Sequence, residues 1–254
     1  MGYFERKKEI LNLLSQSQNL KVPEISKALK ISMATVRRDL GDMDKEGLIL
    51  RTHGGALLQE DLPLTGFQEK NKVQNQEKKR IAAKAISYIK PGHTIYLDCG
   101  STVYSMVEFL KGIKGIKVIT NSLPIVSSLL PFKGIELNII GGDLDKERRA
   151  VHGIQAIRHI HSLFADLAFI GIDGISTNLR LSSHSEIEAG ISRAMLENSG
   201  KTYLLADSSK FGRRAFLDIG PMSIVQSWIS NTPMTEDLLK SIWEMGVEFI
   251  SSES

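Results

Sequence analysis

Five short polar segments in the second half of the sequence carry residue types that could hold a small anion. The segment Asp98-Cys99-Gly100-Ser101-Thr102 offers two hydroxyls, free backbone N–H groups and a glycine that allows close approach, all of which suit a phosphate. Residues 206–212 add a carboxylate, Asp207, and a cation, Lys210. The other three segments are Thr120-Asn121-Ser122, Gly141-Gly142-Asp143 and Gly171-Ile172-Asp173-Gly174. Each alone is typical of a turn before a capped helix, but the five together favour a pocket for a small phosphorylated ligand.

The elements that precede these segments must bring them to one place. Short apolar runs alternate with amphipathic stretches, and we expect strands at 94–97, 117–120, 136–140, 167–170, 202–206, 226–229 and 248–250. We expect helices near 76–89, 101–111, 123–130, 153–163, 185–198 and 235–245. This alternation predicts a Rossmann-like α/β domain with a largely parallel sheet covered on both faces. Ligands bind such sheets beyond the C-terminal ends of the strands, where the five segments lie.

A second group of residues, near the N-terminus, could contact a nucleic acid. Ser32 is placed to cap a helix whose buried side carries Val36, Leu40 and Met43. On its exposed side, an arginine could form a bidentate contact with guanine or hold a phosphate. A solvated basic face would be the better interpretation if the helix stood alone. The candidate DNA-contacting residues are Ser32, Thr35, Arg37 and Arg38 on this helix, and Arg51 and His53 on the hairpin that follows it.

The elements around that helix favour DNA binding over the solvated face. Helices are expected over 3–17 and from residue 22, ahead of the one that Ser32 caps. Short strands at 48–51 and 56–58 would form a wing around the Gly54-Gly55 turn. The pattern predicts a winged helix-turn-helix, in which the second helix of the motif lies in the major groove. We therefore expect a DNA-binding domain over 1–57, a linker over 58–75 and the α/β domain over 76–254.

The distribution of charge agrees with this division. The net charge of the whole sequence is +3. Residues 1–57 hold ten Lys and Arg against seven Asp and Glu, whereas the remainder holds 22 of each kind. The entire net surplus therefore lies in the domain predicted to bind DNA, although a surplus of three would be weak evidence by itself.

Cysteine content and hydropathy narrow the class of protein. The single cysteine, Cys99, excludes an intramolecular disulfide and a multi-cysteine zinc site, and its apolar surroundings favour a buried structural thiol. Apolar runs stay far below the ~18 residues of a membrane span. We expect a cytoplasmic protein without a bound metal, cofactor or membrane partner.

Two motifs near the N-terminus carry a resemblance to a known family. TVRRDL at 35–40 and EGLILRTHGGA at 46–56 resemble the signature of the DeoR family of bacterial transcription regulators. The second half is similar to that family's sensor domain, with D-x-G-S-T, T-N-S, Gly-Gly, D-x-A-F-x-G and D-x-S-K-F-G in family order. That domain in turn resembles ribose-5-phosphate isomerase.

The resemblance implies a sugar-phosphate effector. Gly100, Ser101, Thr102 and Lys210 would bind its phosphate, and Asp173 and Glu186 would face its hydroxyls. The chain departs from the family in placing Lys146, Arg148 and Arg149 slightly later than the usual basic residue after Gly-Gly. The predicted effector site comprises Asp98, Gly100, Ser101, Thr102, Thr120, Asn121, Gly141, Gly142, Asp173, Glu186, Asp207 and Lys210.

Two functions compete on this evidence. One is a regulator, expected to act as a homodimer or homotetramer on double-stranded operator DNA and to repress a carbohydrate operon until the phosphosugar binds. The other is a phosphosugar isomerase, in which Glu186 would move a proton with help from Asp173 or Lys210. The resemblance favours the regulator, because the isomerases carry a paired-acid loop where this chain has one acid, Asp173.

Overall fold

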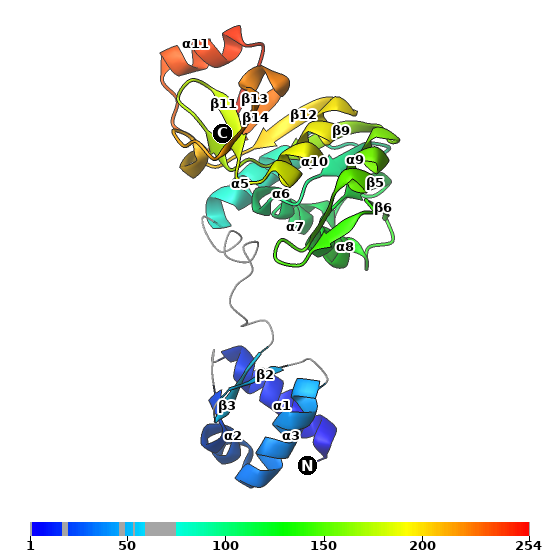
Figure 1. Cartoon of the computed structure of the whole chain (residues 1–254), viewed down its shortest axis with the longest axis vertical. Helices are drawn as coiled ribbons and strands as arrows, with labels where there is room; N and C mark the ends of the chain where they lie inside the picture. The colour runs from blue at the N-terminus through cyan, green and yellow to red at the C-terminus, as the bar shows by residue number, and fades with distance from the viewer. Residues whose placement is uncertain (1, 17–19, 46–48, 53, 59–74, 254) are drawn as a thin grey trace. The chain divides into compact units, whose positions relative to one another are not determined.

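The computed structural model describes the chain except for residues 1, 17–19, 46–48, 53, 59–74 and 254 (Figure 1). Contacts divide it into two compact units, residues 1–65 and 66–254. His53 and most of the predicted linker, 58–75, lie outside the described residues. Among the helices that the structure describes, none has the length and apolar character needed to cross a bilayer.

The first unit is a winged helix-turn-helix, as the sequence predicts. Its helices are α1 (Tyr3–Gln16), α2 (Val22–Leu29) and α3 (Met33–Lys45). The strands β2 (Ile49–Thr52) and β3 (Gly55–Leu58) form the antiparallel wing. A short strand that the sequence analysis did not anticipate, β1 (Leu20–Lys21), adds to the free edge of β3.

The helix α3 begins where the sequence predicts, for the predicted reason. The Ser32 hydroxyl accepts the Thr35 N–H at 3.1 Å and so satisfies one of the free donors of the first turn. Val36, Leu40 and Met43 are fully buried against α1 and α2, in one apolar cluster. The buried side of the helix is therefore fixed, and the opposite side is left to solvent.

The second unit is built on one seven-stranded parallel sheet, which confirms the predicted fold class. All of its strand pairs are parallel. Every predicted strand is present, with bounds shifted by three residues or fewer. In spatial order the strands are β15 (Glu248–Ser251), β14 (Ser227–Ser230), β12 (Ser199–Leu205), β9 (Ala165–Ile170), β4 (Thr94–Leu97), β5 (Ile116–Thr120) and β6 (Ile135–Ile139).

Helices cover both faces of this sheet because side chains alternate between the faces along each strand. On β4, Ile95 and Leu97 pack in one apolar cluster, whereas Tyr96 packs in another on the opposite face. The first face is covered by α5 (Asn75–Ile86), α6 (Ser101–Tyr104), α7 (Val107–Leu110) and α8 (Leu123–Leu129). The second is covered by α9 (Ile154–His161), α10 (Glu186–Glu197) and α11 (Glu236–Glu244).

Two features of the second unit differ from the predicted pattern. The helix expected over 101–111 is split into α6 and α7, because the Ser105 hydroxyl donates to the Ser101 carbonyl and Met106 bonds three residues back. Two small antiparallel sheets were not predicted. They are β7 (Asp143–Asp145) with β8 (Ala150–His152), and β10 (Gly174–Ile175), β11 (Arg180–Ser183) and β13 (Leu217–Pro221).

Candidate functional sites

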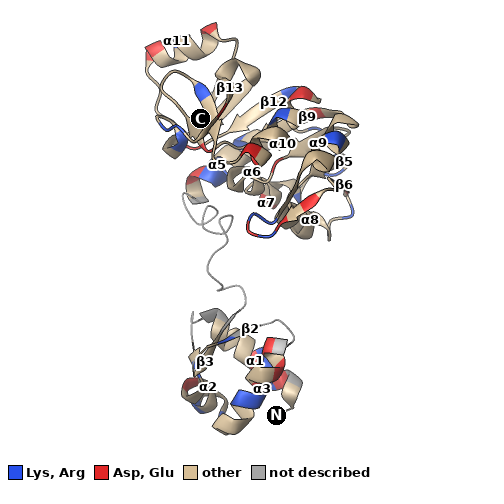
Figure 2. Cartoon of the chain, viewed as in Figure 1, with Lys and Arg blue, Asp and Glu red and all other residues tan. Residues whose placement is uncertain are grey.

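The exposed side of α3 carries the basic residues predicted to contact DNA. Arg37 and Arg38 are exposed, and Thr35 is half-buried with its hydroxyl 2.8 Å from that of Ser32. Figure 2 shows basic residues in blue on this helix. Arg51 is exposed on the wing strand β2. The structure thus places five of the six predicted DNA-contacting residues on or beside α3, and the sixth, His53, is not described.

The acidic residue of the TVRRDL motif has a different role from its arginines. Asp39 is buried and accepts hydrogen bonds from the Arg6 guanidinium on α1, at 2.6 Å from Nε and 2.9 Å from Nη2. The hydrogen bond to Asp39 raises the pKa of Arg6. This bidentate pair joins α1 to α3 and fixes the angle at which the arginines of α3 are presented.

A cavity opens at the C-terminal ends of β4 and β9 in the second unit. It lies where parallel sheets commonly bind ligands. Six predicted effector residues line it: Asp98, Gly100, Ser101, Thr102, Asp173 and Lys210. The remaining lining residues are Cys99, Arg148, His152, Gly171, Ile172, Ser183, Glu188, Ile191, Ser192 and Ile219.

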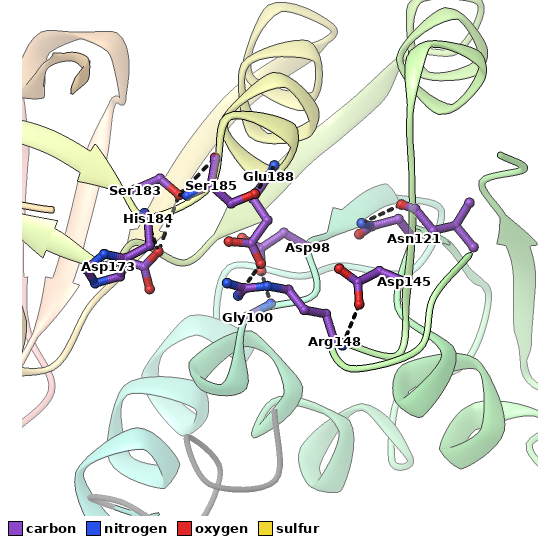
Figure 3. A network of polar contacts seen from close by, with 11 residues as sticks. Asp98, Gly100, Asn121, Asp145, Arg148, Asp173, Ser183, His184, Ser185 and Glu188 are labelled. Atoms are coloured by element: carbon purple, nitrogen blue, oxygen red, sulfur yellow. Dashed lines mark hydrogen bonds and ion pairs between the residues drawn. The ribbon is translucent and has the colours of Figure 1, made fainter. Parts of the chain in front are cut away.

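Asp98 joins two of the loops that form the cavity. One carboxylate oxygen accepts the Gly100 N–H, a contact drawn in Figure 3, and the other accepts the Gly171 N–H, both at 2.7 Å. A side chain at residue 100 would meet Asp98 Oδ1 at 2.9 Å, so the close approach requires glycine. The buried carboxylate therefore shapes the floor of the cavity rather than standing free to bind a ligand.

An ion pair spans the cavity between two elements that are distant in sequence. Arg148, in the turn between β7 and β8, lies 2.5 Å from the Glu188 carboxylate in the first turn of α10. The Asp145 carboxylate accepts the Arg148 backbone N–H at 2.9 Å and holds that turn. Figure 3 shows the Arg148 side chain reaching from its turn toward Glu188 and Asp98.

Further hydrogen bonds hold the lining residues in place. Lys78 of α5 is buried and donates to the Ser101 hydroxyl at 3.1 Å. Asp173 accepts from the Ser183 hydroxyl at 3.3 Å and from the His184 backbone N–H at 3.1 Å. The cavity therefore combines cations and hydroxyl groups with carboxylates that are already held in place.

Cys99 and His152 lie in the same wall. Burial, reinforced by Asp98 and Glu188, raises the pKa of the Cys99 thiol. Burial also lowers the pKa of His152, which favours the neutral imidazole. One atom each of Cys99, His152 and Glu188 lie within 4.8 Å of one another. The interpretation of Cys99 as a buried structural thiol thus omitted that the residue faces the cavity.

Five predicted effector residues serve the frame of the site and do not line the cavity. The Thr120 hydroxyl donates to the Leu97 carbonyl and accepts the Ser122 N–H. The Asn121 amide donates to the Val151 carbonyl. The other three residues shape turns. The Gly141 N–H donates to the His159 ring, and Asp207 accepts the Ser209 N–H. At Gly142, a side chain would collide with the His152 carbonyl oxygen.

The structure places Glu188, rather than the predicted Glu186, in the cavity. Glu186 is exposed at the start of α10. Successive residues of a helix are separated by ~100°, so Glu186 lies about 200° around α10 from Glu188. Glu188, Ile191 and Ser192 share the inward side, and Glu186 points away from it.

Comparison with known proteins identifies the chain over most of its length. The model of the DeoR-like helix-turn-helix domain matches residues 6–61, and that of the DeoR C terminal sensor domain matches residues 73–232. The chain belongs to the DeoR family. The first unit is thus the DNA-binding domain of a DeoR-family transcriptional regulator, and the second contains its sensor domain.

Individual relatives agree with the family. The glycerol-3-phosphate regulon repressor of Escherichia coli (strain K12) is 30% identical over 92% of this chain and 92% of its own length. The lactose phosphotransferase system repressor of Lactococcus lactis subsp. lactis is 36% identical over 84% of this chain and 85% of its own. These comparisons confirm the prediction of a regulator rather than an isomerase.

A solved structure of a ribose-5-phosphate isomerase in complex with phospho-erythronic acid is also similar. It is 18% identical, with a TM-score of 0.41, over 54% of this chain and 54% of its own.

Proposed function

We propose that this chain represses an operon for carbohydrate uptake or catabolism, in the cytoplasm, and that a phosphorylated sugar in its sensor cavity relieves the repression. The observation that carries the effector assignment is the composition of the cavity. Arg148 and Lys210 supply positive charge for a phosphate, whereas Asp173, Glu188 and nearby serines offer acceptors and donors for sugar hydroxyls. A free sugar has no anionic group that could interact with these two cations.

The names of the relatives support the same class of effector. One represses a glycerol-3-phosphate regulon and another a lactose phosphotransferase system. Both names refer to the metabolism of small polyols or sugars, and one names a phosphorylated compound. We therefore extend the class, a phosphorylated sugar or polyol, to this chain.

The DNA-binding step uses the exposed side of α3. We propose that Thr35, Arg37 and Arg38 contact the major groove. Flanking phosphates would be contacted by Ser32 and by the wing residues Arg51 and His53. Two copies of the chain would bind two half-sites of the operator. Effector binding would change the spacing of the two α3 helices. A coupling free energy of ~1–3 kcal/mol is sufficient for useful relief if the effector prefers the non-binding arrangement.

The test measures release of operator DNA from the full chain by a panel of phosphosugars, with the free sugars as controls. Lys210→Ala should keep operator affinity but require a ~10- to 100-fold higher effector concentration, because a hydrogen bond to a charged group contributes ~1.5–3 kcal/mol. Lys90→Ala, at an exposed position away from the cavity lining, is the matched control and should respond like the wild type.

Two results would contradict the proposal at different points. If free sugars release the operator as well as phosphosugars do, the phosphate assignment is wrong. If Lys210→Ala responds at the same effector concentration as the wild type, Lys210 does not bind the phosphate.

A further inference from the structure

The wall of the sensor cavity holds a cluster of three side chains, two of which the phosphosugar proposal does not use. Cys99 follows β4, His152 ends β8 and Glu188 lies in the first turn of α10. One potential ligand atom from each of the three residues lies within 4.8 Å of the other two. Three separate elements of the fold thus bring a thiol, an imidazole and a carboxylate to one point.

The lack of hydrogen-bond partners for the His152 ring indicates a ligand. It is only 4% exposed, and neither of its ring nitrogens has a hydrogen-bond partner among the described residues. Leaving a buried polar group without a partner costs ~1–3 kcal/mol, so such groups are rarely left unsatisfied. The ring also lines the cavity, where a bound ion could reach it.

The chemistry of the three side chains selects the ion. Thiolate, imidazole and carboxylate together suit Zn²⁺, with bonds of about 2.3 Å to sulfur and about 2.0–2.2 Å to nitrogen and oxygen. Tetrahedral bonds of those lengths separate neighbouring ligand atoms by about 3.5 Å. The three atoms lie within 4.8 Å of one another, so each pair must approach by at most about 1.3 Å, which rotation of the side chains can supply.

We propose that Cys99, His152 and Glu188 form a zinc site with a fourth position open to the cavity. A neighbouring group suits this arrangement. Arg148 pairs with Glu188 Oε1 and so holds this carboxylate at the cavity wall. The open position would face the bound effector and take a water or one of its hydroxyls.

The test uses the untagged, metal-free full chain and Co²⁺ as a spectroscopic substitute for Zn²⁺. We expect one Co²⁺ per chain, with a thiolate-to-cobalt charge-transfer band that Zn²⁺ abolishes by displacement. Since the chain has one cysteine, the band can come only from Cys99. Cobalt that binds without this band, or no stoichiometric binding at all, would overturn the proposal without reliance on any variant.

Variants supply the second readout. Cys99→Ser and His152→Ala should each lower zinc affinity by about 100-fold or more, since even residues behind the ligands alter affinity ~10- to 100-fold. His161→Ala, at an exposed position on α9, should leave it unchanged. Equal affinity in Cys99→Ser and wild type would also overturn the site. Neither sugar nor DNA enters these measurements, so the outcome is independent of the proposed effector.

Discussion

Replacing Asp98 with asparagine should destabilise the second unit, because one residue there holds two loops. The carboxylate is 6% exposed and accepts the N–H groups of Gly100 and Gly171, each at 2.7 Å. An asparagine offers one acceptor oxygen, so its NH₂ group must face one of these two donors. One charge-assisted hydrogen bond is lost and a donor is left unsatisfied, which together cost about 3 kcal/mol.

The measurement is thermal or urea unfolding followed by tryptophan fluorescence. Both tryptophans, Trp228 and Trp243, lie in the second unit, so the signal reports on that unit alone. A loss of about 3 kcal/mol should lower its melting temperature by about 6–12 °C for a unit of this size. Most of the signal change should come from Trp228, which is fully buried, since Trp243 is largely exposed.

The matched control lies at the opposite end of the same strands. Asp166 is exposed and accepts one N–H group, that of Thr94, at 2.7 Å. Its replacement by asparagine keeps an acceptor for that single donor, so stability should change by less than ~0.5 kcal/mol. If Asp98→Asn and Asp166→Asn unfold at the same temperature, the reasoning that Asp98 joins two loops is refuted.

Three further predictions concern other parts of the chain. Ser32→Ala should destabilise the first unit by ~1 kcal/mol and speed amide exchange in the first turn of α3; unchanged exchange would exclude the cap. Gly55→Ala should abolish operator binding, because the added Cβ would lie 2.3 Å from a β1 carbonyl oxygen. Gly54→Ala meets no atom within 4 Å and should lower the stability of the first unit by only ~1–2 kcal/mol, because of the positive φ at that position. Equal effects of the two substitutions would contradict this reasoning. The hydrogen bond from Arg180 lowers the pKa of Asp218 below its ordinary value of 3.8. The interaction between the two side chains therefore stabilises the fold fully above pH 3.8, and this stabilisation is lost as the pH falls through the lowered pKa. Acid titrations of stability should be shallower for Asp218→Asn, and identical profiles would exclude the contribution.

The sequence predicts the frame of both units because the frame depends on local signals. A capping serine, an apolar spacing of three and four residues, and apolar runs of strand length act over a few positions each. The cap of Ser32 and the burial of Val36 and Leu40 follow from those signals alone. For the same reason, the positions of the polar segments at the ends of β4 and β9 could be predicted.

The residues that the prediction missed depend on orientation rather than on local signals. Glu188 could have been found from helix phase, because it lies three residues before Ile191 on the buried side of α10. Arg148 could not have been found in this way. The backbone conformation of its turn decides which of the basic residues there enters the cavity. Arg149 adopts a positive φ of 52°, and a sequence pattern does not encode how that turn directs each side chain.

The surroundings of the cavity carboxylates suit the proposed role of a site that binds a phosphosugar without converting it. A general base must reach a substrate proton and change its own protonation state during the reaction. Glu188 is held at 2.5 Å by Arg148, which belongs to a different element, and Asp173 accepts two hydrogen bonds from the β11 end of its own sheet. Both carboxylates are therefore held in place and oriented as hydrogen-bond acceptors. Carboxylates held in this way can accept hydrogen bonds from the hydroxyls of a ligand, which is what the proposed sensor requires.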